Sequence, residues 1–204
     1  MTLSYHLQIV NLLAALLLLI SFAMLSQRRV AGLITLFAWQ GAALTASTAL
    51  IAWSTNQHHL YYSAAITLLL KVIAMPWYFK RLMRKLDVNR VVEPMINIPT
   101  TMLIGIVLVI FSFNLALPIS ELSGTVTRST LGIAIACVLL AFLMMITRTK
   151  AIPQVIGFLA MENGLFFAAT SATNGMPMVV EFGIALDVLV GALILGIFFF
   201  QIRE

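Results

Sequence analysis

The sequence predicts an all-α, polytopic membrane protein with about seven transmembrane helices. Of its 204 residues, 62% are hydrophobic and only 9% are charged, whereas a soluble domain carries about a quarter charged residues. Apolar runs of about 20 residues, the length needed to cross a bilayer, follow one another along the chain. Short polar, glycine or proline segments separate them. The residues outside these runs are enough only for short loops, so no globular domain outside the bilayer is expected.

The expected spans, in chain order, are residues 7–25, 31–53, 61–79, 100–117, 129–147, 152–171 and 178–202. Residues 1–6 hold no Lys or Arg, so the first run lacks the basic start of a secretory signal peptide and is expected to remain as a span. The longest separator, residues 80–99, begins as a basic, amphipathic continuation of the third span. This segment either orients the chain and meets anionic lipid, or docks a cytoplasmic partner.

The basic residues predict the orientation. Ten of them fall after the first, third and fifth spans and at the C-terminus, against Arg128 on the other side. The ten are Arg28, Arg29, Lys80, Arg81, Arg84, Lys85, Arg90, Arg148, Lys150 and Arg203. The positive-inside rule therefore places the N-terminus outside and the C-terminus in the cytoplasm. The net charge of +5 then reflects membrane topology, and no nucleic-acid partner is expected.

Several kinds of chemistry have no residues to support them here. The single cysteine, Cys137, lies in an apolar run and cannot form an intrachain disulfide, an iron–sulfur cluster or a thiolate zinc site. His58 and His59 are expected to be solvated loop residues. The chain has no phosphate-binding loop, no dinucleotide fingerprint and no haem-attachment motif. We therefore expect no cofactor, no metal and no catalytic site in this chain.

Two parts of the chain resemble each other. A basic loop and an apolar helix interrupted by Gln40 match a second basic loop and helix interrupted by Glu162, and Lys71 in the next helix aligns with Asp187. This predicts two parallel three-helix units, residues 1–99 and 129–204, joined by a linking transmembrane helix within residues 100–128. The alternative is chance similarity between apolar helices.

Three ionisable residues lie near the middle of predicted spans, namely Lys71, Glu162 and Asp187. Each costs about 2.5–3.5 kcal/mol to insert, or roughly 8–10 kcal/mol together if they are independent. Glu181 lies in the first turn of the seventh span. Groups of this kind usually face a bundle interior or a wet cavity, where they pair or relay protons. The alternative is a buried salt bridge with a structural role, which gives little net stability after desolvation.

The surroundings of these residues favour a relay. Pro76 removes a backbone hydrogen bond to the Val72 carbonyl and predicts a kink after Lys71. Glycines flank both acids and allow either close helix packing or a file of water. Gln40 and Asn163 are supporting polar residues that can orient a water or a carboxylate, although Asn163 can instead satisfy a neighbouring backbone group.

At residues 155–164 and 180–187 the sequence resembles a known family. Val-Ile-Gly-Phe-Leu-Ala-Met-Glu-Asn-Gly, followed by Val-Glu-Phe-Gly-Ile-Ala-Leu-Asp, is similar to hydrogenase-4 component E. That family provides a membrane subunit of formate-hydrogenlyase-type and related complexes. Its last three helices resemble the K subunit of complex I and the C subunit of multisubunit cation/proton antiporters. The length and the expected spans fit the same family.

The resemblance implies a subunit of a bacterial or archaeal cytoplasmic-membrane complex that couples redox chemistry to proton or sodium movement. Glu162 and Asp187 resemble the two intramembrane acids of the K subunit, and Lys71 is implied to modulate them. Antiporter-like and complex I-like subunits would be the partners, and iron–sulfur or hydrogenase subunits would hold the redox centres. The alternatives are a cation/proton antiporter without a redox partner, a small autonomous transporter, and a purely structural spacer in a membrane arm.

Overall fold

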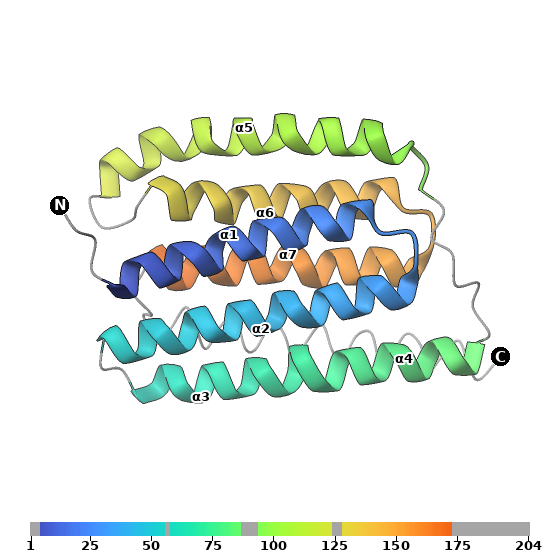
Figure 1. Ribbon diagram of the computed structural model, residues 1–204, viewed down its shortest axis with the longest axis horizontal. Helices are drawn as coiled ribbons and strands as arrows, with labels where there is room; N and C mark the ends of the chain where they lie inside the picture. The colour runs from blue at the N-terminus through green and yellow to red at the C-terminus, as the bar shows by residue number, and fades with distance from the viewer. Residues whose placement is uncertain (1–4, 56–57, 87–93, 124–127, 173–204) are drawn as a thin grey trace.

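The computed structural model describes residues 5–55, 58–86, 94–123 and 128–172. Regular structure in these ranges is helical, apart from an isolated bridge between Pro94 and Arg148. The elements are α1 (Tyr5–Ser26), α2 (Val30–Thr55), α3 (His58–Thr67), the π-helical segment η1 (Leu68–Ala74), α4 (Met75–Leu86), α5 (Ile98–Ser123), α6 (Arg128–Thr147) and α7 (Ala151–Ala172) (Figure 1).

Six helical stretches of the described chain are long and apolar enough to cross a membrane, which confirms the predicted all-α membrane class. They are Gln8–Ser26, Val30–Ser54, Leu60–Arg84, Ile98–Ser120, Ser129–Thr147 and Ala151–Ser171. Each overlaps one of the first six predicted spans, and the third unites α3, η1 and α4. The seventh predicted span, residues 178–202, lies outside the described residues.

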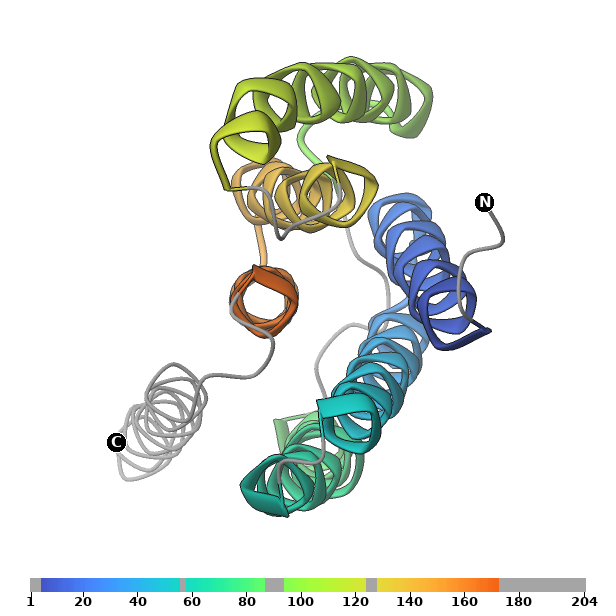
Figure 2. The ribbon, with the colours of Figure 1, turned by 90° about the vertical axis from the view of Figure 1, so that its left-hand side faces the viewer.

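The helices form two rows, which Figure 2 shows end-on: α1, α2 and the α3–α4 span in one, and α5, α6 and α7 in the other. The rows meet where α1 packs against α6 and α2 against α7. In Figure 1, α1 and α6 run in the same direction, and α2 and α7 both return the opposite way. This is the arrangement expected of parallel units. The duplication stays a prediction, because the last helix of the second unit falls outside the described residues.

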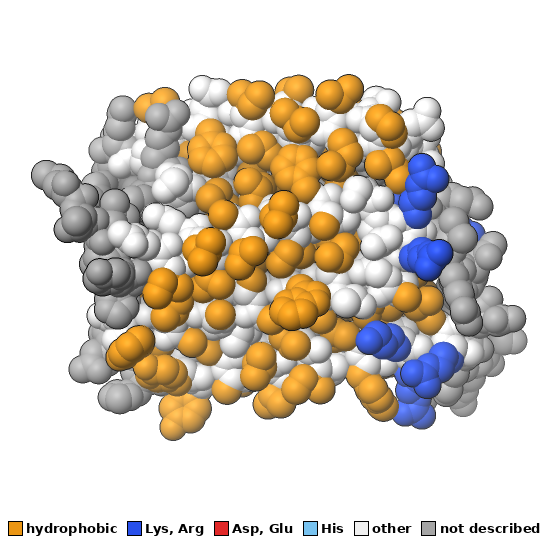
Figure 3. Space-filling model, in the orientation of Figure 1, with side chains coloured by type: hydrophobic (Ala, Val, Ile, Leu, Met, Phe, Trp, Pro, Cys, Tyr) orange, Lys and Arg blue, Asp and Glu red, His pale blue; other side chains and the backbone are white. Residues whose placement is uncertain are grey.

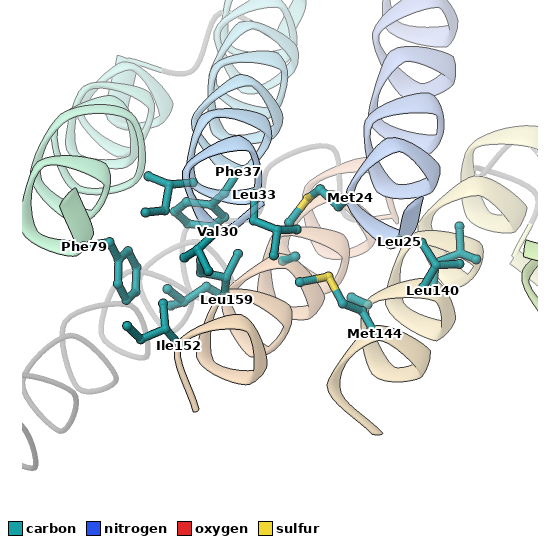
Figure 4. Close-up of a cluster of buried hydrophobic side chains, with 14 of the residues drawn as sticks. Met24, Leu25, Val30, Leu33, Phe37, Phe79, Leu140, Met144, Ile152 and Leu159 are labelled. Carbon is teal, nitrogen blue, oxygen red and sulfur yellow. The ribbon is translucent and has the colours of Figure 1, made fainter. Parts of the chain in front are cut away.

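Two apolar clusters fill the bundle, one toward each end. The basic-end cluster lies beside the α1–α2 and α6–α7 connections, and five helices contribute to it (Figure 4). Its labelled members are Met24, Leu25, Val30, Leu33, Phe37, Phe79, Leu140, Met144, Ile152 and Leu159. The far-end cluster consists of Ala14, Leu17, Ala43, Leu44, Ile51, Ala52, Leu60, Ile133, Ala134, Cys137, Phe166 and Phe167. Between lipid-embedded helices such contacts stabilise chiefly by van der Waals packing.

Glycines bring α7 close to α6. A Cβ added at Gly164 would lie 2.9 Å from Val138 Cγ2 and 3.1 Å from the Val138 backbone nitrogen. At Gly157 it would lie 2.8 Å from Met145 Cγ. Of the two roles that the sequence allows for these glycines, the described residues show close helix packing.

Basic side chains gather at one end of the bundle, and hydrophobic side chains cover much of the visible face between the ends (Figure 3). At that end α4 is amphipathic, as the sequence predicts: Phe79 and Leu82 are buried, while Lys80, Arg81 and Arg84 are exposed. Arg81 lies 5.3 Å from the centre of the exposed Trp77 ring, a distance suited to a cation–π contact.

Arg148 is buried, whereas a basic residue in a loop between two spans is ordinarily solvated. Its side chain is 1% exposed, and its Nη2 donates to the Leu25 carbonyl, 2.7 Å away, in the last turn of α1. A cation at a helix C-terminus satisfies a terminal carbonyl and opposes the helix dipole. Burial lowers the pKa of the Arg148 guanidinium from its usual value. Arg148 thus ties the α6–α7 connection to the end of α1.

We expect Gly164→Ala to destabilise the protein by about 1–3 kcal/mol, because the new methyl group would press on the backbone of α6. Thermal unfolding in detergent, followed by tryptophan fluorescence, measures this change. Gly32→Ala is the control, since its methyl group would meet only the flexible side chain of Gln27. Equal unfolding temperatures for the two variants would show that α6 and α7 do not pack as described.

Candidate functional site

A layer of polar residues separates the two apolar clusters. On α1, α2 and α7, a buried polar residue falls in sequence between the members of the basic-end cluster and those of the far-end cluster. The α3–α4 span repeats the pattern, with Lys71 between Leu60 and Phe79. We call this set the polar layer; it consists of Ser21, Gln40, Lys71, Glu162 and Asn163. Its place between the clusters puts it near the middle of the membrane-crossing helices.

A hydrogen-bond chain crosses three helices within the polar layer. Asn163 Nδ2 donates to Gln40 Oε1 at 3.1 Å, and Gln40 Nε2 donates to Ser21 Oγ at 3.1 Å. Ser21 Oγ in turn donates to the Leu17 carbonyl at 2.9 Å. The chain joins α7, α2 and α1 where no solvent reaches, and buried amides of this kind fix the relative position of the helices that carry them.

Lys71 lies against both α2 and α7. Its side chain is 2% exposed, and a Cβ added at Gly41 of α2 would come within 3.1 Å of Lys71 Cβ. Its Nζ lies 5.8 Å from the centre of the Phe166 ring, close enough for a cation–π interaction. Phe166 follows Glu162 by one helical turn, and residues four apart share a helix face. The ammonium of Lys71 is therefore held on the side of α7 that carries Glu162.

The backbone around Lys71 is irregular. The π-helical segment η1 runs from Leu68 to Ala74, and at its end the Met75 N–H bonds to the Leu70 carbonyl, five residues back. Pro76 follows directly; it has no N–H to donate, and its ring crowds the carbonyl four residues earlier. A wider turn before the proline relieves this conflict. The irregularity expected from Pro76 is thus present as a π-helical turn, a feature often found at functional sites.

Glu162 is 4% exposed and lies next to Asn163 on α7. The helix that carries it, α7, packs against α2 and α6. A carboxyl group in such a place is far from bulk water, and its ionisation depends on the few charged and polar groups around it. Lys71 is the cation of the polar layer.

The structure brings four of the predicted site residues into one layer: Gln40, Lys71, Glu162 and Asn163. The other two, Glu181 and Asp187, lie outside the described residues. Sequence reasoning missed Ser21, although a serine inside the strongly apolar first span was a usable signal. It also treated Arg148 only as a topology charge.

The described residues contain no group of three or more His, Cys, Asp or Glu side chains able to hold a metal ion. Cys137 is buried between α6 and its neighbours. The polar layer itself offers an ammonium, a carboxyl group, two amides and a hydroxyl. Such a set is suited to hydrogen bonding and proton exchange.

No family model matches the chain, and no solved structure matches it. A Mycobacterium tuberculosis protein, Uncharacterized protein Rv0085, is 32% identical to it over 197 residues. The match covers 96% of this chain and 90% of the relative. The chain belongs to the family of this mycobacterial protein. The match takes in nearly the whole membrane bundle, and the name of the relative assigns it no activity.

We expect Gln40→Leu to lower stability by about 1–2 kcal/mol, because it leaves Asn163 Nδ2 without its acceptor in a buried layer. Denaturation in mixed micelles measures the loss. Thr45→Val on the same helix is the control, since the Thr45 hydroxyl bonds only within α2, to the Gly41 carbonyl. If Thr45→Val were as destabilising as Gln40→Leu, the inter-helix chain would contribute nothing specific.

Proposed function

We propose that the chain is an integral membrane subunit of a multisubunit, redox-driven ion-translocating complex of the hydrogenase-4 or formate-hydrogenlyase type. In this proposal the polar layer forms part of a proton or cation path through the membrane arm. The observation that carries it is the burial of Lys71 on a π-helical turn against the face of α7 that holds Glu162.

The energetic cost of this arrangement supports a role beyond anchoring. Each charged group costs about 2.5–3.5 kcal/mol or more at the bilayer centre, and a buried ion pair returns little of that in net stability. In a helix that only packs against its neighbours, leucine at the same positions would avoid this cost of insertion. Ionisable groups retained at this depth are typical of ion paths and proton relays.

The surrounding polar side chains support the same function. The amides of Gln40 and Asn163 hold α2 and α7 together at the level of the two charged residues. A relay needs donors and acceptors whose positions do not drift, because a proton moves only between groups in hydrogen-bond contact. In the proposal, Asp187 continues the path in the last span, and Glu181 lies at its outer end.

Redox chemistry belongs to partner subunits in this proposal. The candidate site has hydrogen-bonding and titratable groups but no thiolate set for a cluster. Iron–sulfur and hydrogenase subunits would supply electrons, and antiporter-like membrane subunits would lie beside this chain. The basic end of the bundle supports a cytoplasmic orientation of the α1–α2 and α6–α7 connections, in a bacterial or archaeal cytoplasmic membrane (Figure 3).

The test uses the assembled complex in proteoliposomes. Glu162→Gln and Lys71→Gln each keep a polar side chain of similar length but remove titration. We expect each, like Asp187→Asn, to lower ion translocation per electron transferred more than about tenfold, since a general acid–base group contributes at least that much to proton transfer.

The matched control is Lys80→Gln, which makes the same chemical change as Lys71→Gln on an exposed side chain of the same span. It is expected to leave coupling unchanged. Normal translocation in a complex that carries Glu162→Gln and Asp187→Asn together would contradict the proposal and favour a spacer. Co-purification with antiporter subunits alone, without iron–sulfur subunits, would contradict the redox assignment.

A further inference from the structure

Three fully buried hydroxyl groups on α2 and α3 lack the hydrogen bond that most buried hydroxyls of the described helices make. In lipid-embedded helices Ser and Thr usually donate to a carbonyl three or four residues earlier on their own helix. Thr48, Thr147 and Thr170 do so, bonding to Leu44, Leu143 and Phe166. The hydroxyls of Ser47, Ser63 and Thr67 have no hydrogen-bond partner among the described residues, although all three residues are at most 1% exposed.

We call these three hydroxyl groups, on the neighbouring helices α2 and α3, the hydroxyl seam. Ser47 follows Gln40 by seven residues and lies on the same face of α2. Ser63, Thr67 and Lys71 follow one another at intervals of four residues and therefore share a face of the α3–η1 helix. Gly41 of α2 meets Lys71, and α2 runs antiparallel to α3 (Figure 1). Counting six residues along each helix from that contact places Ser47 level with residue 65, between Ser63 and Thr67.

The spacing fits water. Side chains one helical turn apart are about 5–6 Å apart. One water molecule with two hydrogen bonds of about 2.8 Å bridges that distance. A buried water needs two to four polar partners, and the three hydroxyls with the Lys71 ammonium supply them. At the end of the seam away from Lys71, the same count places Ala52 level with Leu60, and both are fully buried.

We infer that Ser47, Ser63 and Thr67 line a branch of the ion path that admits water and leads from the α2–α3 end of the bundle to Lys71. The Lys71 amine accepts a proton from this branch each time its ammonium has released one to the polar layer. This inference rests on the proposed path at Lys71 and Glu162. In the described structure the three hydroxyls are buried, and the fully buried Leu60 and Ala52 lie at the outer end of the seam. The branch opens when α3 moves away from α2 by the width of one water molecule.

A proton passes along this branch by exchange between neighbours. Each water or hydroxyl accepts one proton and releases another, so its composition is unchanged after the transfer. The branch enters through the N-terminal helices. These helices carry Gln40 and Lys71 at the positions that align with the two acids of the C-terminal unit, so they hold no acid of their own there. The branch gives these helices a role in supplying protons to the polar layer.

Cysteine labelling tests hydration directly, in the complete complex in native membranes. Ser47→Cys, Ser63→Cys and Thr67→Cys are made in a Cys137→Ala background and treated with aminoethyl methanethiosulfonate. The reagent attacks the thiolate, which forms only where water reaches the sulfur. We expect labelling more than about tenfold faster than that of the native chain, whose Cys137 is 1% exposed within the far-end cluster.

Leu69→Cys is the second control: it lies beside the seam in sequence, but its side chain is 58% exposed on the outer face of the bundle. A thiol there meets lipid and is expected to react slowly. Labelling at the three seam positions no faster than at Cys137 would overturn the inference.

If a cysteine variant fails to assemble, a pair of isosteric variants tests whether the seam hydroxyls take part in transport. Thr67→Val removes a hydroxyl of the seam, and Thr48→Val removes an equally buried hydroxyl that bonds only to the Leu44 carbonyl. We expect a severalfold loss of ion translocation for Thr67→Val and none for Thr48→Val. Equal rates for the two variants would overturn the branch as a transport route.

The inference and the proposed function fail in different ways. Unreactive seam cysteines, with translocation abolished by Glu162→Gln, would refute the branch and leave the proposed function standing. Reactive seam cysteines, with normal translocation in the Glu162→Gln complex, would refute the proposed function and with it the use of the seam for transport.

Discussion

The structure depends on one constraint, which is that a polar group inside a bilayer has no water to bond to and must be satisfied by the protein. Apolar side chains alone would let these helices slide past one another, because lipid is as apolar as leucine. The chain from Asn163 through Gln40 to Ser21 fixes the level at which α7, α2 and α1 meet. The two apolar clusters then pack above and below that level, and the polar layer is kept away from both membrane surfaces.

The same constraint explains the backbone around the charged residues. Small residues such as Gly41 and Gly164 let helices approach closely enough for buried polar groups to reach their partners. The π-helical turn before Pro76 places Lys71 against α2 and α7 at once. A local departure from regular helix geometry is tolerated where neighbouring helices satisfy the freed backbone groups. The site is therefore a product of packing between the two rows of helices rather than of any one helix.

Much of this arrangement follows from the sequence. Length and hydropathy predicted the first six spans within a few residues, because crossing a bilayer fixes both the length and the composition of a helix. Lys71 and Glu162 stood out as costly residues in apolar runs. The partners of Gln40 were not predictable, since contacts between helices distant in sequence depend on register and crossing angle. Nor was the π-helical turn, since Pro76 is equally compatible with a simple kink. The burial of Arg148 was not predictable either, because a basic residue that follows a span is ordinarily a solvated topology signal.

In the proposed function, Glu162 is a titrating carboxyl group held within the influence of the Lys71 ammonium. Infrared difference spectroscopy of the lipid-reconstituted complex, recorded as the pH is changed, follows the carbonyl stretch of a protonated carboxyl group directly. We expect a titrating band that disappears in Glu162→Gln and whose midpoint differs in Lys71→Gln but not in Lys80→Gln. A band that survives Glu162→Gln unchanged, or a midpoint indifferent to Lys71, would contradict it.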